Sequence, residues 1–360
     1  MNDPRQRSAD ADEFAGRTML VTGGGGFLGR TVLEGLAETF PGRIISIHRR
    51  PLAVAGARLP APHLEVRADL HDHERWCDHL HEVDYVFWMA ALRDHGSSVA
   101  QAERENVEPL RAALSVLRNR PQFKRLVFTS TISAVDQPDH PSRPRPVTDD
   151  SPPYPRTPYG YSKLMSEQLL AASGVPHTIL RLPFLYGPGF RSGSFLDFYR
   201  TIVHTPLLSA LRFTGNLSLL YTGDVAGLLL EIIATRNVDA AGTSPYVLSD
   251  GSTYEVDDLV SLVAEVHGLR RPGRRVPASV GQLASAFALA LRRVTRPQPV
   301  ARSRAGLLAT YWSHAAFTRD YFVVDSSRFH AALPHCTYTP VDAGIPRSFA
   351  PCALAIRPSL

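Results

Sequence analysis

A run of glycines near the N-terminus constrains the fold of this chain more than any other feature. The segment 22–29 reads TGGGGFLG, and it lies between an aliphatic run and a segment with helical periodicity. Glycine at 23 and 26 allows the backbone to turn tightly and approach a pyrophosphate, and Gly29 allows a helix to pack closely on a sheet. The N-terminus of that helix would face the phosphates with unpaired N–H groups. The order of strand, glycines and helix therefore predicts a dinucleotide-binding site.

Short aliphatic runs alternate with helical segments through the first half of the chain. This alternation is typical of a parallel sheet that is covered by helices on both faces. The expected strands are residues 17–22, 43–48, 64–67, 84–89, 125–129 and 177–182, and the expected helices are residues 27–40, 100–117 and 159–172. The fold class that we predict is α/β, with a doubly wound parallel sheet of the Rossmann type.

The chain is expected to divide after residue 182, where the regular alternation ends. Residues 1–15 are polar and predict a flexible tail, and residues 16–182 form the expected Rossmann domain. Residues 183–360 are expected to form mainly a smaller substrate-binding lobe, with 217–250 partly returning to the Rossmann domain. A proline-rich stretch at 136–158 precedes a candidate catalytic helix, and it is either a surface loop or a partial lid over the site.

Composition excludes several classes of protein. The hydrophobic fraction of 44% and the charged fraction of 20% are ordinary for a globular chain of 360 residues. The net charge is +5, but the arginines are scattered, so we expect no nucleic-acid partner. The N-terminal segment has no apolar run, and the apolar segment 280–291 is too short to span a bilayer, so we expect no integral membrane segment.

The cysteines and histidines predict neither a disulfide framework nor a metal site. The three cysteines are far apart and odd in number, which fits a reducing compartment, and we expect a cytoplasmic location. His73 and Cys77 are four residues apart in a histidine-rich segment. No second pair of ligands accompanies them, so the segment is more simply read as a polar surface helix.

The end of the second expected strand bears on the choice of dinucleotide. Domains that bind NAD commonly carry an acidic residue about 20 residues after the glycines, where it bonds the ribose 2′-hydroxyl. This sequence has Arg49 and Arg50 in that region. Because a guanidinium fork suits a 2′-phosphate, we predict NADP(H) as the cofactor. The alternative is that both arginines are solvated loop charges.

A series of motifs in the expected order resembles the extended short-chain dehydrogenase/reductase family, which includes NAD-dependent epimerases and dehydratases. The motifs are TGGGGFLG at 22–29, RADL at 67–70, VDYVFWMAA at 83–91, NV at 106–107, FTST at 128–131, YGYSK at 159–163, RLPFLYGPG at 181–189 and TGDVA at 222–226. They cover residues 17–250. More weakly, YVLSD at 246–250 and FVVDSSR at 322–328 resemble the branch that contains the 3β-hydroxysteroid dehydrogenases.

The resemblance assigns roles around the expected dinucleotide. It implies that Asp69 receives the adenine amino group, that Ala90 and Ala91 line the cleft, and that Pro183 lies beside the nicotinamide. Trp88 stands where the family often has histidine, and it either packs under the sheet edge or narrows the nicotinamide pocket. The predicted cofactor-binding residues are Gly23, Gly26, Phe27, Leu28, Gly29, Arg49, Arg50, Asp69, Leu70, Ala90, Ala91, Lys163 and Pro183.

Tyr159 and Lys163 form the candidate catalytic pair. They are four residues apart on a helix that is expected to begin near Pro158, so their side chains project from one face. A neighbouring ammonium favours the phenolate and lowers the pKa of a phenol toward the range useful for acid-base catalysis. The chain has only two lysines, Lys124 and Lys163. By resemblance, Lys163 also holds the nicotinamide ribose, and Tyr159 gives a proton to the substrate oxygen as hydride arrives from the cofactor.

A third catalytic residue should be a hydroxyl near the end of the fifth strand. Alignment with the family motif gives this role to Thr131, where serine is usual. Ser130 and Ser133 are alternatives, because a slip of one residue turns a strand side chain to the opposite face.

The predicted function is that of an NADPH-dependent ketoreductase that acts on a small, apolar ketone or its alcohol. Five aromatic residues in the region that lines the family's substrate pocket suggest apolar character, although they could equally be core: Phe184, Phe195, Phe198, Tyr199 and Phe213.

Two other functions are open. A nucleotide-sugar epimerase or 4-ketoreductase could use Arg191 to bind a diphosphate, and a non-catalytic NADP-sensing protein could share the fold. A sugar 4,6-dehydratase is disfavoured, because Ile132 and Ser133 replace the acidic pair that would follow Thr131. Since the family commonly dimerises through two of the helices, 100–117 and 159–172, we also expect a homodimer.

Overall fold

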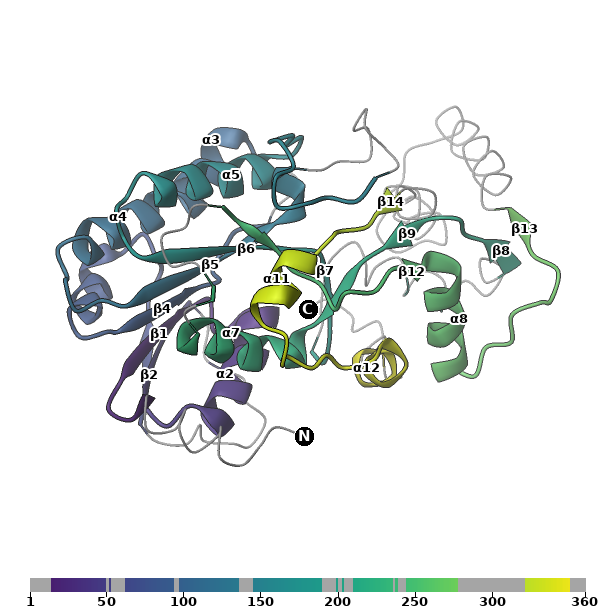
Figure 1. Cartoon of the computed structure of the whole chain (residues 1–360), viewed down its shortest axis with the longest axis horizontal. Coiled ribbons are helices and arrows are strands. Elements are labelled where there is room, and N and C mark those ends of the chain that lie inside the picture. Colours follow the sequence, from purple (N-terminus) through teal and green to yellow (C-terminus); the bar gives the residue numbers. More distant parts are fainter. Residues whose placement is uncertain are drawn as a thin grey trace, which may run out of the picture.

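The computed structural model describes residues 14–49, 52, 62–93, 97–135, 145–189, 199, 203, 210–235, 237–238, 244–277 and 321–349. In this part of the chain a large sheet lies beside a smaller group of short strands and helices (Figure 1). The large sheet consists of β1 (Thr18–Thr22), β2 (Arg43–His48), β3 (His63–Arg67), β4 (Tyr85–Trp88), β5 (Arg125–Thr131), β6 (His177–Leu182) and β11 (Tyr246–Val247).

The strand order of the large sheet is β11-β6-β5-β4-β1-β2-β3, and every neighbouring pair in it is parallel. The order reverses direction between β1 and β4. In such sheets a ligand binds outside the carboxyl ends of the strands, at the point of reversal. The predicted α/β class with a doubly wound parallel sheet is confirmed.

Helices cover both faces of the large sheet (Figure 1). One face carries α2 (Phe27–Thr39) and α7 (Val225–Ala234), and the other carries α3 (Val99–Asn106), α4 (Glu108–Leu117) and α5 (Pro158–Ala171). The side chains of β1 alternate accordingly, since Met19 and Val21 pack with α2 and α7 while Leu20 packs with α4. This alternation follows from the two-residue period of a strand and gives the sheet two separate apolar layers.

The segment expected as one helix at 100–117 is broken in the structure. The break falls between α3, which ends at Asn106, and α4, which begins at Glu108. Pro109 lies in the first turn of α4. Proline has no N–H and its ring clashes with the preceding turn, so a helix cannot continue through this position without interruption. Other boundaries also differ slightly, and β5 continues two residues beyond the expected end, to Thr131.

The smaller group contains short strands and two helices in the described residues. β7 (Phe184–Tyr186) pairs with β10 (Leu219–Tyr221), and β13 (Val276–Pro277) pairs with β8 (Leu211–Arg212). A three-stranded sheet consists of β12 (Tyr254–Glu255), β9 (Asn216–Leu217) and β14 (Tyr321–Phe322). The helices are α8 (Val256–Val266) and α12 (Val341–Ser348). A further helix, α11 (Ser327–Ala332), packs against β11 of the large sheet through Phe329. Phe27 of α2 packs against the apolar core of the smaller group, and this contact joins the two parts of the molecule at the start of α2.

No helix in the described ranges is both long enough and apolar enough to cross a membrane. The apolar segment 280–291 lies outside those ranges.

Candidate active site

The glycine turn between β1 and α2 has no room for side chains. Gly23 has a φ of +75°, a left-handed conformation that favours glycine, and its N–H donates to the carbonyl of Ile47 at 2.8 Å. A Cβ at Gly23 would lie 2.9 Å from Cα of Ala90, and a Cβ at Gly29 would lie 2.2 Å from the carbonyl oxygen of Gly23. The turn therefore lies directly against the end of β4 and the first turn of α2.

The N-terminus of α2 is suited to a phosphate. Its N-cap residue is Gly26, which offers no side chain to the N–H groups, and the first turn carries no acidic residue. Phe27 and Leu28 of that turn are half-buried. Backbone N–H groups with a favourable helix dipole form an anion site when nothing else caps them. The residues of this turn thus fit the pyrophosphate of a dinucleotide.

Residues predicted for the adenosine end lie near one another at the ends of β2 and β3. The guanidinium of Arg49 is 3.7 Å from Oδ2 of Asp69, and both side chains are largely exposed. Asp69 also accepts a hydrogen bond from the backbone N–H of His71 at 3.0 Å. Leu70 is half-buried, and its carbonyl accepts from the indole of Trp76 at 3.1 Å. Arg50 lies outside the described residues.

The end of β4 is fixed beside the glycine turn by Thr22. The Thr22 hydroxyl oxygen accepts from the backbone N–H of Met89 at 3.1 Å and of Ala90 at 3.2 Å. Ala90 is half-buried and Ala91 is exposed. Trp88 is only 1% exposed, and its ring lies 6.0 Å from that of Trp76 in an edge-to-face arrangement. This position supports the packing interpretation of Trp88 over a role in the nicotinamide pocket.

The structure brings Tyr159 and Lys163 together at the start of α5. The helix begins at Pro158, and the Thr157 hydroxyl caps it by accepting from the N–H of Gly160 at 3.0 Å. Lys163 is 2% exposed, and its Nζ donates to the carbonyl oxygen of Thr129 at 2.7 Å. The same Nζ lies 5.9 Å from the centre of the Tyr159 ring. The pair therefore projects from one face of α5 toward the end of β5.

Burial shifts both groups of the pair toward their neutral forms. Desolvation lowers the pKa of Lys163 to about 7, although the negative charge of Glu167 opposes the shift. Desolvation raises the pKa of Tyr159, which the positive charge of Arg93 partly offsets, so the lowering expected from a neighbouring ammonium is outweighed by burial. The Arg93 guanidinium lies 6.0 Å from the centre of the Tyr159 ring. A neutral phenol in this position can donate a proton, as the reduction of a ketone requires.

The three candidates for the third hydroxyl have different surroundings. The Ser130 hydroxyl donates to the carboxylate of Glu167, so it is committed to a buried partner. Thr131 is 9% exposed, and its hydroxyl oxygen accepts from the N–H of Ser133 at 3.2 Å. A Cβ at Gly160 would lie 2.4 Å from the Ser133 carbonyl oxygen, so the first turn of α5 rests on this segment. The contacts of Ser130 argue against its catalytic role and favour Thr131 or Ser133.

The predicted substrate-side residues are only partly brought to the site. Pro183 is buried between β6 and β7, and Phe184 is half-buried, with its ring 5.4 Å from that of Phe322. Tyr199 and Phe213 are 0% and 1% exposed in the core of the smaller group, so the structure identifies both as core. Arg191, Phe195 and Phe198 lie outside the described residues.

The described end of the proline-rich stretch packs against the C-terminal part of the chain. Val147 forms a bridge with Val324, and the N–H of Tyr154 donates to the carbonyl of Ala134 at 3.1 Å. Residues 136–144 lie outside the described ranges, so the lid interpretation stays a prediction.

Asn106 is a buried residue that the sequence placed in a motif without indicating which groups it contacts. It is 4% exposed, and its amide exchanges two hydrogen bonds with the backbone of Leu92, at 2.6 Å and 3.1 Å. It also donates to the Ser162 hydroxyl at 2.8 Å. Asn106 thereby ties the loop after β4, which carries Arg93, to the catalytic helix α5. The motif NV at 106–107 was the only available signal.

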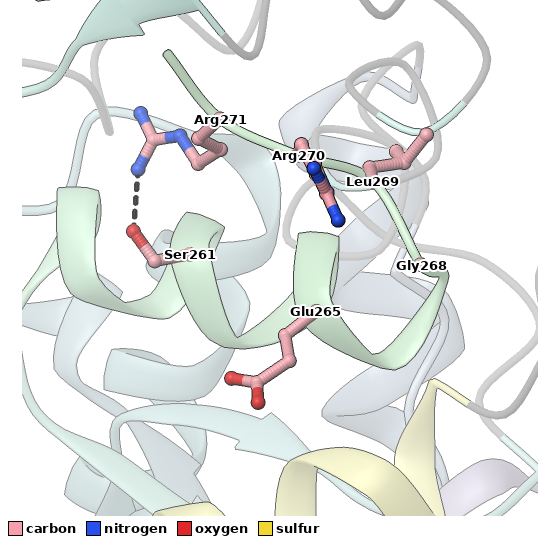
Figure 2. Close-up of a pocket in the computed structure, with 6 residues that line it drawn as sticks. All are labelled: Ser261, Glu265, Gly268, Leu269, Arg270 and Arg271. Atoms are coloured by element: carbon pink, nitrogen blue, oxygen red, sulfur yellow. Dashed lines mark hydrogen bonds between the residues drawn. The ribbon is translucent and has the colours of Figure 1, made fainter. Parts of the chain in front are cut away.

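A separate pocket of about 310 Å³ lies at the end of α8, as Figure 2 shows. Its lining includes Ser261, Glu265, Arg270 and Arg271. Arg271 donates to the Ser261 hydroxyl at 2.6 Å and pairs with Asp257 at 2.9 Å. The positive charge of Arg271 is therefore balanced by a carboxylate of the smaller group. None of the predicted catalytic residues lines this pocket. Among the described residues, no group of three or more His, Cys, Asp or Glu side chains could hold a metal ion.

Residues 19–245, which are more than half of the chain, match the model of the NAD dependent epimerase/dehydratase family.

Curated relatives include both reductases and epimerases. The 4-hydroxy-2-methyl-3-oxo-4-farnesyl-3,4-dihydroquinoline-1-oxide ketoreductase of Stigmatella aurantiaca is 28% identical, over 81% of this chain and 85% of the relative. A UDP-glucose 4-epimerase of Streptomyces lividans is 28% identical over 48% of this chain and 53% of the relative. A 2-alkyl-3-oxoalkanoate reductase of Stenotrophomonas maltophilia is 29% identical over 48% of this chain and 52% of the relative.

Solved structures share the fold at low sequence identity. The terminal R domain from the myxalamid PKS-NRPS biosynthetic pathway has a TM-score of 0.71 and 19% identity, with 96% of each chain covered. MoeE5 in complex with UDP-glucose and NAD has a TM-score of 0.65 and 23% identity, with 92% of this chain and 97% of MoeE5 covered.

Proposed function

Because the chain belongs to the NAD dependent epimerase/dehydratase family, we propose that it is an NADPH-dependent ketoreductase that reduces an apolar ketone to a secondary alcohol. The observation that carries this proposal is the pair of half-buried Tyr159 and buried Lys163, which lies at the carboxyl edge of the sheet, at the end of β5. The raised pKa of Tyr159 supports a neutral proton donor.

The extent of the similarity favours a ketoreductase over an epimerase. The Stigmatella ketoreductase matches 81% of this chain, whereas the Streptomyces epimerase matches 48%. A match over 307 residues must include part of the chain beyond the sheet domain, where we place the substrate. The Stenotrophomonas relative is named as a reductase of a 2-alkyl-3-oxoalkanoate, which is a second kind of ketone. We therefore expect a ketone with an apolar chain.

In the proposed reaction, the residues of this chain bind, orient and protonate the ketone. A bound reduced nicotinamide supplies the hydride to the carbonyl carbon. Tyr159 donates its phenolic proton to the carbonyl oxygen, which leaves a secondary alcohol and a phenolate. Lys163 stabilises that phenolate as an ammonium and holds the nicotinamide ribose, and Thr131 orients the oxygen through its hydroxyl. The glycine turn and the start of α2 hold the pyrophosphate.

A screen for NADPH consumption tests the function. Purified protein is incubated with NADPH and either a 2-alkyl-3-oxoalkanoate, a long-chain aliphatic ketone or a UDP-sugar, and absorbance loss is followed. We expect consumption with at least one of the two ketones and none with UDP-glucose. Interconversion of UDP-glucose and UDP-galactose in a parallel incubation with the oxidised cofactor, NAD⁺ or NADP⁺, without net reduction of that cofactor, would instead assign the epimerase function. Tight NADPH binding without turnover of any substrate would indicate a nucleotide sensor.

The cofactor preference is a separate proposal that depends on Arg49. We expect NADPH to bind at least tenfold more tightly than NADH, because we propose that the guanidinium of Arg49, which is exposed, pairs with the 2′-phosphate. Arg49→Asp should abolish or reverse that preference. The measurement is a fluorescence titration of each reduced dinucleotide.

The matched control is Arg75→Asp, which makes the same change of charge at another exposed arginine, one that pairs with Asp72. It should leave the preference unchanged. Equal affinities for NADPH and NADH in the unmodified protein would contradict the proposal, and so would an equal loss of preference in both variants.

A homodimer is our proposal for the assembly. Val99 on α3 and Tyr161 on α5 are large apolar side chains that are 44% and 43% exposed, on helices through which the family commonly dimerises. Light scattering should give twice the mass of the chain, and Tyr161→Arg should shift the mass toward that of a monomer. A monomer at all concentrations would show that these helices face solvent.

A further inference from the structure

A buried carboxylate lies one helical turn beyond Lys163. Glu167 of α5 is 5% exposed and accepts hydrogen bonds from Nε and Nη2 of Arg181 at 3.1 Å and 2.7 Å. It also accepts from the hydroxyl of Ser130. Arg181 is itself 5% exposed. A charge pair removed from water is stable only when its hydrogen bonds are satisfied, and these contacts satisfy most of the carboxylate.

The contacts of Glu167 converge on the end of β5. Ser130 lies between Thr129, whose carbonyl oxygen accepts from Lys163, and Thr131, the proposed hydroxyl of the site. Ser130 is also the register partner of Arg181 on β6. A carboxylate on α5 therefore holds two adjacent strands at the level of the site. This arrangement fixes how far α5 lies along β5, and with it the position of Lys163.

Glu167 is also the anion that balances the buried cations. Lys163 and Arg181 are both buried and positively charged when protonated. Around Lys163 the ring of Phe128 lies 4.5 Å and the neutral ring of Tyr159 lies 5.9 Å from Nζ, and beyond Tyr159 lies Arg93, which is positive. Arg181 donates further to the backbone carbonyl of Asp149, whose carboxylate is bound by Arg328 at 2.7 Å. If Glu167 were absent, the two buried cations would repel each other at this end of β5, and Arg181 would lack its paired carboxylate.

We propose that Glu167 is a positioning residue for the reaction, which keeps Lys163 in its ammonium form and sets α5 against the end of β5. The proposal rests on the proposed role of Lys163 in catalysis. It assigns Glu167 no contact with substrate or cofactor. Its effect is transmitted through Lys163, Ser130 and Arg181.

The scarcity of lysine allows a direct test that does not depend on activity. The chain has two lysines, and Lys124 is exposed, so protein labelled with ¹³C and ¹⁵N in lysine gives one buried signal and one reference signal. In the unmodified protein the Lys163 signal should titrate at a pKa of about 7, since burial disfavours the ammonium. In Glu167→Gln the midpoint should fall by about one unit or more, because an opposing charge has been removed.

Two further variants separate charge from packing. Ser130→Ala removes one hydrogen bond to Glu167 but keeps its charge, so Lys163 should titrate as in the unmodified protein. The double variant Glu167→Gln, Arg181→Met removes one charge of each sign, and the Lys163 midpoint should return toward its original value. If Glu167→Gln alone does not fold, Arg181→Met decides the matter: it leaves the carboxylate of Glu167 without its paired cation, so the Lys163 midpoint should rise above that of the unmodified protein, and an unchanged midpoint would overturn the proposal. An unchanged midpoint in Glu167→Gln, or a midpoint in the double variant that stays as low as in Glu167→Gln, would overturn the proposal.

Kinetics provides a second readout on any ketone that the protein reduces. If the ammonium of Lys163 is required, kcat/KM falls as the pH rises through its pKa. Glu167→Gln should move that fall to lower pH, whereas the loss of a purely structural residue would lower kcat/KM equally at all pH values. If no ketone is reduced, the proposed function is wrong, and the lysine titration still decides the role of Glu167.

Discussion

Tyr159→Phe is expected to lower kcat for ketone reduction by about 10²- to 10⁴-fold, which is the usual contribution of a positioned acid-base group. The ring and its packing are kept, so the fold and the affinity for NADPH should change little. Only the hydroxyl that protonates the substrate oxygen is lost, and this interaction is made in the transition state. Turnover is measured by NADPH absorbance, and affinity by fluorescence titration.

Tyr161→Phe is the matched control for this variant. It removes a hydroxyl from the same helix two residues later, on a side chain that is 43% exposed. Its kcat should equal that of the unmodified protein. A Tyr159→Phe variant with near-normal turnover would contradict proton donation by Tyr159 and would make a differently catalysed reaction the better account.

Lys163→Met is expected to lower both kcat and the affinity for NADPH, each by tenfold or more. The ammonium is proposed to stabilise the phenolate of Tyr159 and to hold the nicotinamide ribose, so its loss affects chemistry and binding together. Methionine fills similar space, and the ion pair of Glu167 and Arg181, which has no net charge, remains intact. The fold should therefore survive, and an unchanged NADPH affinity would contradict the ribose contact.

The same variant should also change how stability depends on pH. In the folded protein burial lowers the pKa of Lys163 to about 7, while an unfolded lysine titrates near 10.4. Between these values the unfolded chain binds more protons, so this lysine makes the protein more stable as the pH rises. Below pH 7 the buried ammonium costs on the order of 5 kcal/mol, since each pKa unit corresponds to about 1.4 kcal/mol.

Lys163→Met avoids that cost. Urea unfolding should therefore find the variant more stable than the unmodified protein at pH 6, with a difference that shrinks toward pH 10. A difference that is constant across this range would show that Lys163 is not destabilised by burial.

The sequence was sufficient to predict the parts of the fold that depend on local patterns. Apolar runs identified six strands of the large sheet, because fully buried parallel strands are nearly continuous in hydrophobicity. The glycine turn was identified by glycines at positions where the fold has no room for a Cβ, as the geometry at Gly23 and Gly29 bears out. The segment 100–117 was predicted as one helix where the structure has two, because apolar periodicity outweighed the local effect of Pro109.

The site was only partly predictable, because several of its contacts join residues far apart in sequence. The pairing of Ser130 with Glu167 spans 37 positions, and no motif indicates that a glutamate on α5 is buried. Similarly, Tyr199 and Phe213 are aromatic and lie in the region expected to line the pocket, yet they pack into the core of the smaller group. Aromatic residues serve cores and pockets equally well, so residue type alone could not separate the two roles.

The measurement that most directly tests the central claim is hydride transfer to a ketone from NADPH deuterated at the reactive carbon of its nicotinamide. The alcohol product is analysed by mass spectrometry for the unmodified protein and for Tyr159→Phe. We predict an alcohol that carries one deuterium on its carbinol carbon, formed by the unmodified protein and lost almost entirely in Tyr159→Phe. Equal formation of that alcohol by both proteins, or epimerised UDP-sugar in place of any alcohol, would contradict the account.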